Sequence, residues 1–329
     1  MSVRDLIVVG AGPSGLSAAI AARQRELDYQ VLEQGVLVNS IFRFPPQMVF
    51  FTTPELLEIG GLPFVSPYEK PTRGEALNYY RKVVEKYDLQ ISYGEKVLSV
   101  QREDDVFALE TRTSRGVLRA RSARNVLMAI GYYDHPNLIG VPGEDLPHVH
   151  HYYSEPHAYF RQRVVIVGGG NSAAEAALEC FRAGARVTLV HRWPQLKATI
   201  KYWVKPDIEN RIKEGSVATR FNTCVTEITP TSVVVRTAGS DRDEELPADA
   251  VLLLTGYRSD SNLLRAAGVQ LNERCVPTYN PETLETNVPG LFLAGGAVAG
   301  NDTSNIFIEN GRFHGEKIVQ VIADRIDRL

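Results

Sequence analysis

The feature that most constrains the fold of this chain is a glycine-rich turn that occurs twice. The first copy, GAGPSG at residues 10–15, follows the apolar run 6–9 and precedes an alanine-rich stretch of helical character. The second copy, GGGNSA at residues 168–173, follows the apolar run 164–167 and precedes a similar stretch. A strand, a glycine turn and a helix in this order are typical of a dinucleotide-binding domain. Two copies in register predict two such domains.

The residue at the end of the next strand predicts which dinucleotide each copy binds. Glu33 and His191 each lie 23 positions after the first glycine of their turn. A carboxylate at this place accepts hydrogen bonds from a ribose 2′-hydroxyl, as in FAD or NAD. His191 and Arg192 would instead bind a 2′-phosphate, because a guanidinium makes charge-assisted bonds to phosphate. The first copy therefore predicts a FAD site and the second an NADP site, with a solvated strand end as the alternative interpretation of His191 and Arg192.

The glycines of each turn have separate expected roles. The first permits the tight turn, the second lets the backbone approach a pyrophosphate, and the third, or an alanine there, lets the helix pack closely on the strand. The N–H groups at the start of the helix then bind the phosphates. The FAD contacts expected from this motif are Gly10, Gly12, Pro13, Ser14, Gly15 and Glu33. The expected NADP contacts are Gly168, Gly170, Asn171, Ser172, Ala173, His191, Arg192 and Lys197, with Lys201 adding charge nearby.

Three further apolar strands end in glycine and complete the two domains. Residues 125–131 and 250–256 would each close one dinucleotide domain, and residues 291–296 are expected to return to the first sheet beside the flavin. The glycines that end these strands are therefore further expected contacts: Gly131, Gly295 and Gly296 for FAD, and Gly256 for NADP.

The predicted fold is α/β, with two Rossmann-like dinucleotide-binding domains and the NADP domain inserted into the FAD domain. The expected boundaries are 1–140 and 260–329 for the FAD-binding domain and 141–259 for the NAD(P)H-binding domain. Residues 134–156, rich in proline and histidine, are expected to form a linker, and a final amphipathic helix is expected over about 311–328.

Composition excludes several other classes of protein. A net charge of −3 argues against a nucleic-acid-binding protein, which needs a surplus of basic residues. The three cysteines, Cys180, Cys224 and Cys275, are too widely spaced for a disulfide framework or a metal site, and they favour a reducing, cytoplasmic compartment. No stretch has the roughly 18 uninterrupted apolar residues of a membrane span. We therefore expect a cytoplasmic protein that binds no nucleic acid, membrane or metal.

Several longer segments carry a family resemblance over the whole chain. They are NSI at 39–41, FFTTPELLEIG at 50–60, KPTR at 70–73 and IFIENGRFHG at 306–315. With the domain order above, they resemble the thioredoxin-reductase-like flavoproteins, and within them the bacillithiol-disulfide reductase family (YpdA or Bdr type). The resemblance implies FAD as prosthetic group, NADPH as hydride donor, a low-molecular-weight thiol disulfide as acceptor, and a homo-oligomer. It adds Gln34, Asn39, Ser40 and Ile306 to the expected FAD contacts.

The chain also departs from this family. The redox-active cysteine pair of thioredoxin reductases is missing, since residues 131–164 contain no cysteine. Relatives commonly have a cysteine in the first glycine motif, where this chain has Ser14, the candidate catalytic position. Relatives of thioredoxin reductase often carry an aspartate for the ribityl chain where this chain has Gly296.

Three classes of function stay open at this point. They are a reductase of a small disulfide, an electron-transfer reductase for a small carrier protein such as a ferredoxin or flavodoxin, and a redox-sensing flavoprotein with low turnover. Ser14 favours the second and third classes, whereas the family segments favour the first. Further polar or aromatic candidates near the flavin, for which ordinary packing is the preferred interpretation, are Tyr132, Tyr133, His150, His151 and His314.

Overall fold

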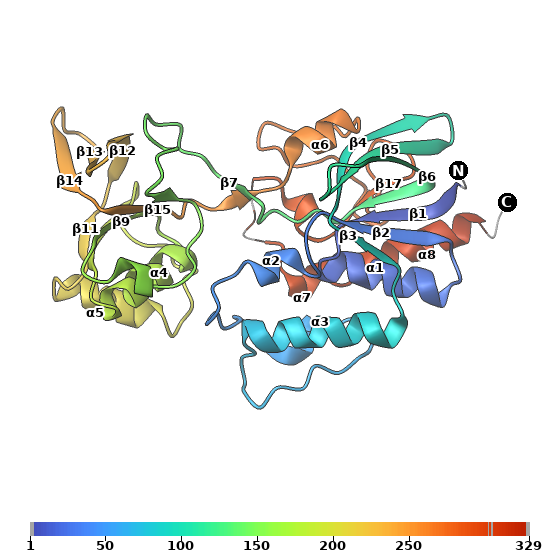
Figure 1. Cartoon of the computed structure of the whole chain (residues 1–329), viewed down its shortest axis with the longest axis horizontal. Helices are drawn as coiled ribbons and strands as arrows, with labels where there is room; N and C mark the ends of the chain where they lie inside the picture. Colours follow the sequence, from blue (N-terminus) through green and yellow to red (C-terminus); the bar gives the residue numbers. More distant parts are fainter. Residues whose placement is uncertain (1–2, 302, 304, 327–329) are drawn as a thin grey trace. The chain divides into compact units, whose positions relative to one another are not determined.

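The chain folds into two compact units, one inserted into the other. The computed structural model describes residues 3–301, 303 and 305–326. Unit 1 comprises residues 1–135 and 257–329, and unit 2 comprises residues 136–256. Figure 1 draws unit 1 in the blue and red ends of the colour scale and unit 2 mostly in green and yellow. The boundaries expected from the sequence are 140/141 and 259/260, and the two units divide at 135/136 and 256/257.

Unit 1 is built on a mixed sheet of seven strands in the order β3-β2-β1-β6-β5-β4, with β17 paired to β6. The strands are β1 (Arg4–Val9), β2 (Tyr29–Glu33), β3 (Ile91–Tyr93), β4 (Glu95–Glu103), β5 (Val106–Thr113), β6 (Leu118–Met128) and β17 (Leu291–Leu293). The neighbours of β1 and β2 are parallel, whereas β4, β5 and the first half of β6 form an antiparallel meander. β17 pairs in parallel with the end of β6, so the predicted return of this strand to the first sheet is observed.

Residues 6–9 of the central strand β1 are buried on both faces of the sheet, which explains their uninterrupted apolar sequence. Leu6 and Val8 pack into the core with α1, α3 and α8, whereas Ile7 and Val9 pack into the opposite core, which includes residues of α6. Figure 1 shows α1 and α8 side by side against the sheet. The helices of unit 1 are α1 (Pro13–Gln24), α2 (Asn39–Phe42), α3 (Arg73–Tyr87), α6 (Ser261–Ala266), α7 (Ile308–Gly311) and α8 (His314–Ile326), with the 3₁₀ turns η1 (Pro54–Leu57) and η3 (Gly295–Ala299).

Unit 2 repeats the central part of this plan. A five-stranded parallel sheet has the order β11-β10-β9-β15-β8, and a separate antiparallel sheet has the order β12-β13-β14. The parallel strands are β8 (Val149–His150), β9 (Arg163–Val167), β10 (Arg186–Val190), β11 (Ala218–Arg220) and β15 (Ala250–Leu253). The others are β12 (Thr223–Ile228), β13 (Ser232–Thr237) and β14 (Asp243–Pro247), and the helical elements are η2 (His157–Tyr159), α4 (Asn171–Arg182) and α5 (Lys205–Lys213). The chain passes between the units along β7 (His135–Pro136) and β16 (Tyr257–Arg258), which pair with each other.

Two elements differ from the sequence prediction. The helix expected over about 311–328 is α8, which begins later, at His314, because the separate short helix α7 ends at Gly311; residues 327–329 lie outside the described residues. The linker expected over 134–156 contains β8, an edge strand of the sheet of unit 2.

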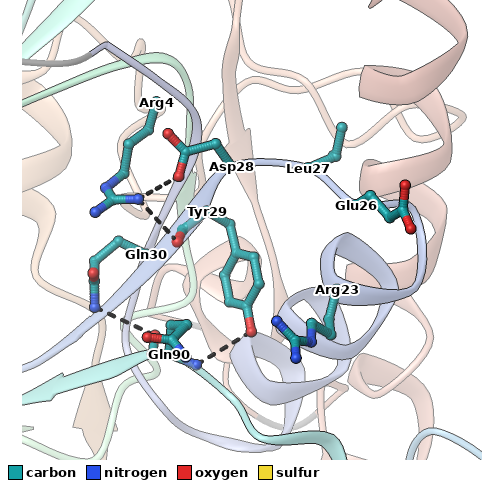
Figure 2. Close-up of a pocket in the computed structure, with 8 residues that line it drawn as sticks. All are labelled: Arg4, Arg23, Glu26, Leu27, Asp28, Tyr29, Gln30 and Gln90. Carbon is teal, nitrogen blue, oxygen red and sulfur yellow. Dashed lines mark hydrogen bonds and ion pairs between the residues drawn. The ribbon is translucent and has the colours of Figure 1, made fainter.

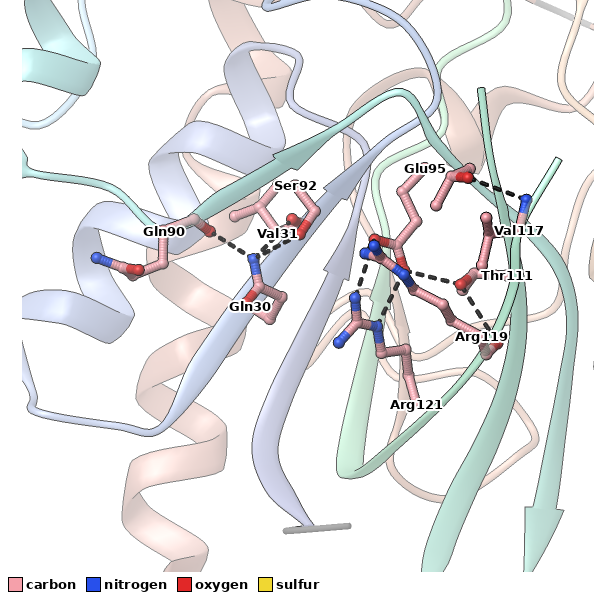
Figure 3. A network of polar contacts seen from close by, with 10 residues as sticks. Gln30, Val31, Gln90, Ser92, Glu95, Thr111, Val117, Arg119 and Arg121 are labelled. Atoms are coloured by element: carbon pink, nitrogen blue, oxygen red, sulfur yellow. Dashed lines mark hydrogen bonds and ion pairs between the residues drawn. The ribbon is translucent and has the colours of Figure 1, made fainter. Parts of the chain in front are cut away.

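The antiparallel meander of unit 1 is held by a buried carboxylate that no sequence pattern predicted (Figure 3). Glu95 is 1% exposed and accepts two hydrogen bonds from Arg121 (2.9 and 3.0 Å), one from Arg119 (3.2 Å) and one from Thr111 (2.7 Å). Burial opposes ionisation of Glu95, but the hydrogen bonds from Arg121 and Thr111 and the charges of both arginines outweigh it and hold its pKa below the usual value. The carboxylate therefore joins β4, β5 and β6 on one face.

Candidate dinucleotide-binding sites

The first glycine turn leaves an open place at its second glycine. Gly10 has a φ of 109°, and a Cβ there would lie 2.4 Å from the carbonyl oxygen of Ala129 at the end of β6. A Cβ at Gly15 would lie 2.0 Å from the carbonyl oxygen of Gly10, so α1 approaches the strand as closely as the motif requires. A Cβ at Gly12 would meet nothing within 4 Å. The space beside Gly12 fits the approach of a pyrophosphate.

The start of α1 offers unpaired donors at this place. Gly12 is the N-cap, no side chain caps the helix, and Pro13 occupies the first turn. The N–H groups at the start of a helix of this length lack partners within it, and with the helix dipole they favour an anion. The turn therefore fits the phosphates of a dinucleotide.

Glu33 is fixed at the end of β2 by backbone donors. Its side chain is 5% exposed, and its two oxygens accept hydrogen bonds from the N–H groups of Ala11 and Gly35, both at 2.8 Å. Burial raises the pKa of Glu33, and these two hydrogen bonds act against the rise. Each carboxylate oxygen has a second acceptor site, so Glu33 can still accept a ribose hydroxyl.

The other FAD contacts expected from the sequence lie in the same unit. Gly131, with a φ of 63°, would carry a Cβ 4.0 Å from the hydroxyl of Ser40, and a Cβ at Gly35 would overlap the side chain of Asn39. The side chain of Gln34 donates to Asp134, the residue that also pairs with Arg43. Ile306 is half-buried against the core that includes β6 and β17. Ser40 of the segment 39–42 thus lies near Gly131, which follows β6.

The side chain of Ser14 occupies space that is free because two neighbouring residues, Gly295 and Gly311, have no side chains. A Cβ at Gly295 would lie 2.4 Å from the hydroxyl oxygen of Ser14, and a Cβ at Gly311 would lie 3.2 Å from it. Gly315 brings α8 onto the backbone of α1 in the same way, since its Cβ would lie 2.7 Å from the carbonyl oxygen of Ser14. The N–H of Gly295 donates to Nδ1 of His314 at 3.2 Å. The family segment at 306–315 therefore converges on Ser14 and on the turn after β17.

The second glycine turn has the same geometry in unit 2. A Cβ at Gly168 would lie 2.5 Å from the carbonyl oxygen of Leu254 and 3.1 Å from the Cβ of Ala173. Ala173 is fully buried, whereas Ser172 is exposed. Gly170 is the uncapped N-cap of α4, and a Cβ there would meet only Lys197, at 3.8 Å. This turn also fits a pyrophosphate.

His191 differs from the cation expected beside a 2′-phosphate. Its ring is 6% exposed and lies under the turn, with Nε2 only 2.3 Å from where a Cβ of Gly169 would be. Burial lowers the pKa of His191, and the charges of Arg192 and Lys197 lower it further, so the ring is neutral at pH 7. Arg192 is exposed, with its guanidinium 5.7 Å from the ring centroid of Trp193. The available cation at the end of β10 is therefore Arg192.

The side chain of Asn171 is used inside the protein. It donates to the carbonyl of Thr199 (3.4 Å) and accepts from the N–H of Lys201 (2.8 Å). Lys201 is 6% exposed and pairs with Glu175 at 2.7 Å, so its charge is balanced within unit 2. The N–H of Lys197 donates to the carbonyl of Gly169. The loop after β10 is thus fastened over the glycine turn, which the sequence did not predict.

Other expected residues lie elsewhere in the two units. Gly256 has a φ of 95° and lies against the side chain of Asn137. His150 and His151 lie at and after the edge strand β8 of unit 2, and Tyr133 packs on the rings of Phe44 and Tyr257.

The three cysteines are free and are not paired. Cys180 is fully buried in α4, and burial, with the charge of Glu179, raises its pKa to about 12. Its thiol is therefore inert at neutral pH. Cys224 is exposed on β12 of unit 2, and Cys275 lies in unit 1, where it accepts a hydrogen bond from Arg265.

A pocket at the opposite edge of the sheet of unit 1 is separate from the glycine turn (Figure 2). It lies where β1 and β2 begin and α1 ends, and Arg4 pairs there with Asp28. Dinucleotides bind at the carboxyl ends of parallel strands, so this pocket is at the wrong edge for the motif. In the described part of the chain, no group of three or more His, Cys, Asp or Glu residues could hold a metal ion. Among residues 3–301, 303 and 305–326, no helix is long and apolar enough to cross a membrane.

Comparison with known proteins assigns the family. A family model described as pyridine nucleotide-disulphide oxidoreductase matches residues 7–295. Bacilliredoxin reductase Bdr of Bacillus subtilis is 43% identical over 321 residues, which is 97% of this chain and 97% of that protein. This chain belongs to the Bdr family of pyridine nucleotide-disulphide oxidoreductases.

The structural comparison agrees with the Bdr assignment. Bacillithiol disulfide reductase Bdr (YpdA) from Bacillus cereus matches with a TM-score of 0.96 at 39% identity, over 98% of this chain and 100% of that one. The corresponding protein from Staphylococcus aureus matches with a TM-score of 0.93 at 38% identity, over 99% of both chains. The predicted family and the two-domain Rossmann-like fold are therefore confirmed. As a member of the Bdr family, the chain is an oxidoreductase that uses FAD and NADPH.

Proposed function

We propose that unit 1 binds FAD, that unit 2 binds NADPH, and that the enzyme transfers two electrons from NADPH through FAD to a low-molecular-weight thiol disulfide of the bacillithiol type. The supporting observation is the pair of open glycine turns, one with Glu33 and the other with Arg192 at the end of the next strand. Overall, NADPH, one proton and one disulfide give NADP⁺ and two thiols. A homo-oligomer and a cytoplasmic location stay predictions.

The residues of unit 1 would hold and orient the flavin. FAD, when bound, supplies the chemistry of accepting a hydride and passing on an electron pair. Gly12 leaves room for the pyrophosphate, the N–H groups of α1 bind it, and Glu33 accepts the ribose hydroxyl. Ser14 and Gly295 lie together where α1 begins and just after β17 ends.

The residues of unit 2 would select NADPH. Gly170 leaves room for the second pyrophosphate, and Arg192 provides a cation for the 2′-phosphate. Neutral His191 supports the turn from below by filling the space beside Gly169.

A second function is favoured by one observation, the serine at position 14. A serine hydroxyl does not ionise at neutral pH and cannot form a mixed disulfide, whereas a thiol at the start of a helix has a lowered pKa and reacts as a thiolate. An electron-transfer reductase for a ferredoxin or flavodoxin would need no thiol at this position. A redox-sensing flavoprotein with low turnover would also need none.

A stopped-flow experiment on two forms of the protein separates these functions. Flavin reduction by NADPH and reoxidation by bacillithiol disulfide are followed in the wild type and in Ser14→Cys, with steady-state ferredoxin reduction beside them. We expect fast flavin reduction in both forms and slow reoxidation by the disulfide in the wild type, with a large increase in Ser14→Cys. Gln24→Cys, at the exposed far end of α1, controls for an added thiol.

Each outcome points to one function. Fast reoxidation of the wild type by the disulfide would show that the reaction needs no thiol at position 14. Slow reoxidation by the disulfide in both forms, with efficient ferredoxin reduction, would support the electron-transfer function. Slow reoxidation by both acceptors in both forms would support the sensor.

A further inference from the structure

Two turns at the carboxyl edge of the sheet of unit 1 are tied together by one hydroxyl. Ser259 is 4% exposed, and its hydroxyl lies 2.9 Å from the carbonyl oxygen of Gly131 and 2.9 Å from that of Gly296. These glycines follow β6 and β17, which are neighbouring parallel strands. The hydroxyl of Ser259 therefore fixes the spacing of the turns after β6 and β17. Both turns lie at the carboxyl edge of the sheet, where dinucleotides bind.

The ring of Tyr132 fills the place of a side chain at Gly296. A Cβ there would lie 2.5 Å from Cδ1 and 3.0 Å from Cε1 of Tyr132. Gly296 does not have a positive φ, unlike Gly295 with 58°, so its backbone conformation does not require glycine. The contact with the Tyr132 ring therefore explains why position 296 has no side chain, and why it cannot carry the aspartate of other flavoproteins.

The hydroxyl of Tyr132 is an available donor. Burial raises the pKa of Tyr132, and the charge of Glu309 raises it further, so the phenol keeps its proton at neutral pH. Within the described residues, no hydrogen-bond partner of this hydroxyl is found, and the residue is only partly buried. A protonated, accessible phenol at the edge of the sheet can donate to a ligand.

We propose that Tyr132 is a FAD-positioning residue, with its ring seated on Gly296 as a wall of the flavin site and its hydroxyl donating to an acceptor oxygen of the cofactor. This proposal depends on the proposed placement of FAD in unit 1. It assigns to one aromatic side chain the polar contact that position 296 cannot make.

A double-mutant cycle tests the seating of the ring. FAD affinity is measured by fluorescence titration of apoprotein for the wild type, Gly296→Ala, Tyr132→Ala and the double variant. Gly296→Ala should weaken FAD binding by about tenfold or more, because the new methyl group displaces the ring. In the Tyr132→Ala background the same change should cost less than about twofold, since contacting residues couple. Gly74→Ala in α3, where a Cβ meets only a contact of 3.9 Å, is the matched control and should leave FAD affinity unchanged.

A second measurement tests the hydroxyl. Tyr132→Phe keeps the ring, so the apoprotein should melt at the wild-type temperature, while the FAD dissociation constant rises severalfold and the flavin absorption band shifts. Additive effects in the cycle, or an unchanged FAD affinity in Gly296→Ala, would overturn the proposal. Wild-type affinity and spectrum in Tyr132→Phe would overturn the role of the hydroxyl. Loss of FAD in Gly12→Val shows separately whether FAD binds at the first turn, so failure of the placement is distinguishable from failure of this proposal.

Discussion

The two glycine turns share a backbone and differ in the side chain beside it. In each unit a Cβ on the first glycine, Gly10 or Gly168, would lie 2.4 to 2.5 Å from the carbonyl oxygen of the residue that follows a neighbouring strand. The glycine two positions later, Gly12 or Gly170, has no atom closer than 3.8 Å to its Cβ position. At the end of the next strand, Glu33 accepts two backbone N–H groups, whereas His191 lies neutral under Gly169. In the proposed assignment, the shared backbone binds the phosphates, and the residue at the strand end, or the one after it, distinguishes a ribose hydroxyl from a 2′-phosphate.

The largest expected effect on cofactor binding comes from changing Gly12 or Gly170, the third residue of each turn, one at a time. Gly12 and Gly170 have extended backbones, with φ of −78° and −104°, that any residue adopts. Valine should therefore leave folding intact and block only the ligand, at a cost of about 3 kcal/mol or roughly a hundredfold in Kd. Gly12→Val should be colourless, whereas Gly170→Val should stay yellow but lose flavin reduction by NADPH. Loss of the same ligand in both variants would contradict the division between the units.

The next largest effect concerns Arg192, the cation that follows β10, and its contribution to NADPH affinity. Charge-assisted bonds to a phosphate contribute roughly 1.5–3 kcal/mol each. Arg192→Ala should therefore weaken NADPH binding by about tenfold or more, with NADH little changed, as measured by flavin reduction at varied nucleotide concentration. Arg186→Ala, at the other end of β10, is the matched control. Equal efficiency of NADPH and NADH in the wild type would refute the assignment of Arg192.

A smaller effect is expected from Glu33→Gln. The amide has one acceptor oxygen where the carboxylate has two, so one buried N–H, of Ala11 or Gly35, loses its partner. The apoprotein should lose about 1–3 kcal/mol of unfolding free energy, measured by denaturant titration. Glu103→Gln, on an exposed part of β4, should change nothing. An unchanged stability would mean that Glu33 is already protonated in the apoprotein.

The smallest effect is a change in acid sensitivity. The pKa of His191 is lowered by burial and by Arg192 and Lys197, so the stability linked to it is present above the ordinary histidine pKa and is lost as the pH falls through the lowered value. His191→Asn should therefore show a smaller drop in melting temperature than the wild type between about pH 7.5 and about pH 5. His157→Asn, at an exposed site of the same unit, should keep the wild-type drop. Equal slopes in all three proteins would show that His191 does not contribute.

The turns and their flanking elements were predictable because their causes are local. The short apolar runs before Gly10 and Gly168 are typical of buried strands, and the glycines indicate the turn and the helix that follow. The meander was missed because the first residues of β6, 118–120, are exposed and form no buried apolar run, and because the arginines that pair with Glu95 lie 24 and 26 positions later. The partners of a buried charge at such separations follow from the register of the strands, which no local pattern contains.

The unpredicted parts of the site depend on side chains that are absent. His191 is buried because Gly169 has no side chain, and Tyr132 lies on Gly296 for the same reason. Asn171 is directed to the loop after β10 instead of toward a ligand, since the backbone of Lys201 returns to the start of α4. Sequence patterns indicate which glycines bend the chain, but not which ones make room for a distant ring.

The insertion of unit 2 into unit 1 has a consequence for biosynthesis. During translation, residues 136–256 leave the ribosome as one continuous stretch and can fold as soon as they emerge. The sheet of unit 1 is completed only when β17 has been synthesised, and α1 is covered only when α8 has been synthesised. Both elements lie near the end of the chain. Until synthesis ends, the nascent chain therefore carries a finished unit 2 and a sheet of unit 1 that lacks β17 and the cover of α8. We therefore expect flavin to bind only after synthesis: a ribosome stalled when residue 256 has left the exit tunnel, but before β17 has, should carry a folded unit 2 but no yellow colour.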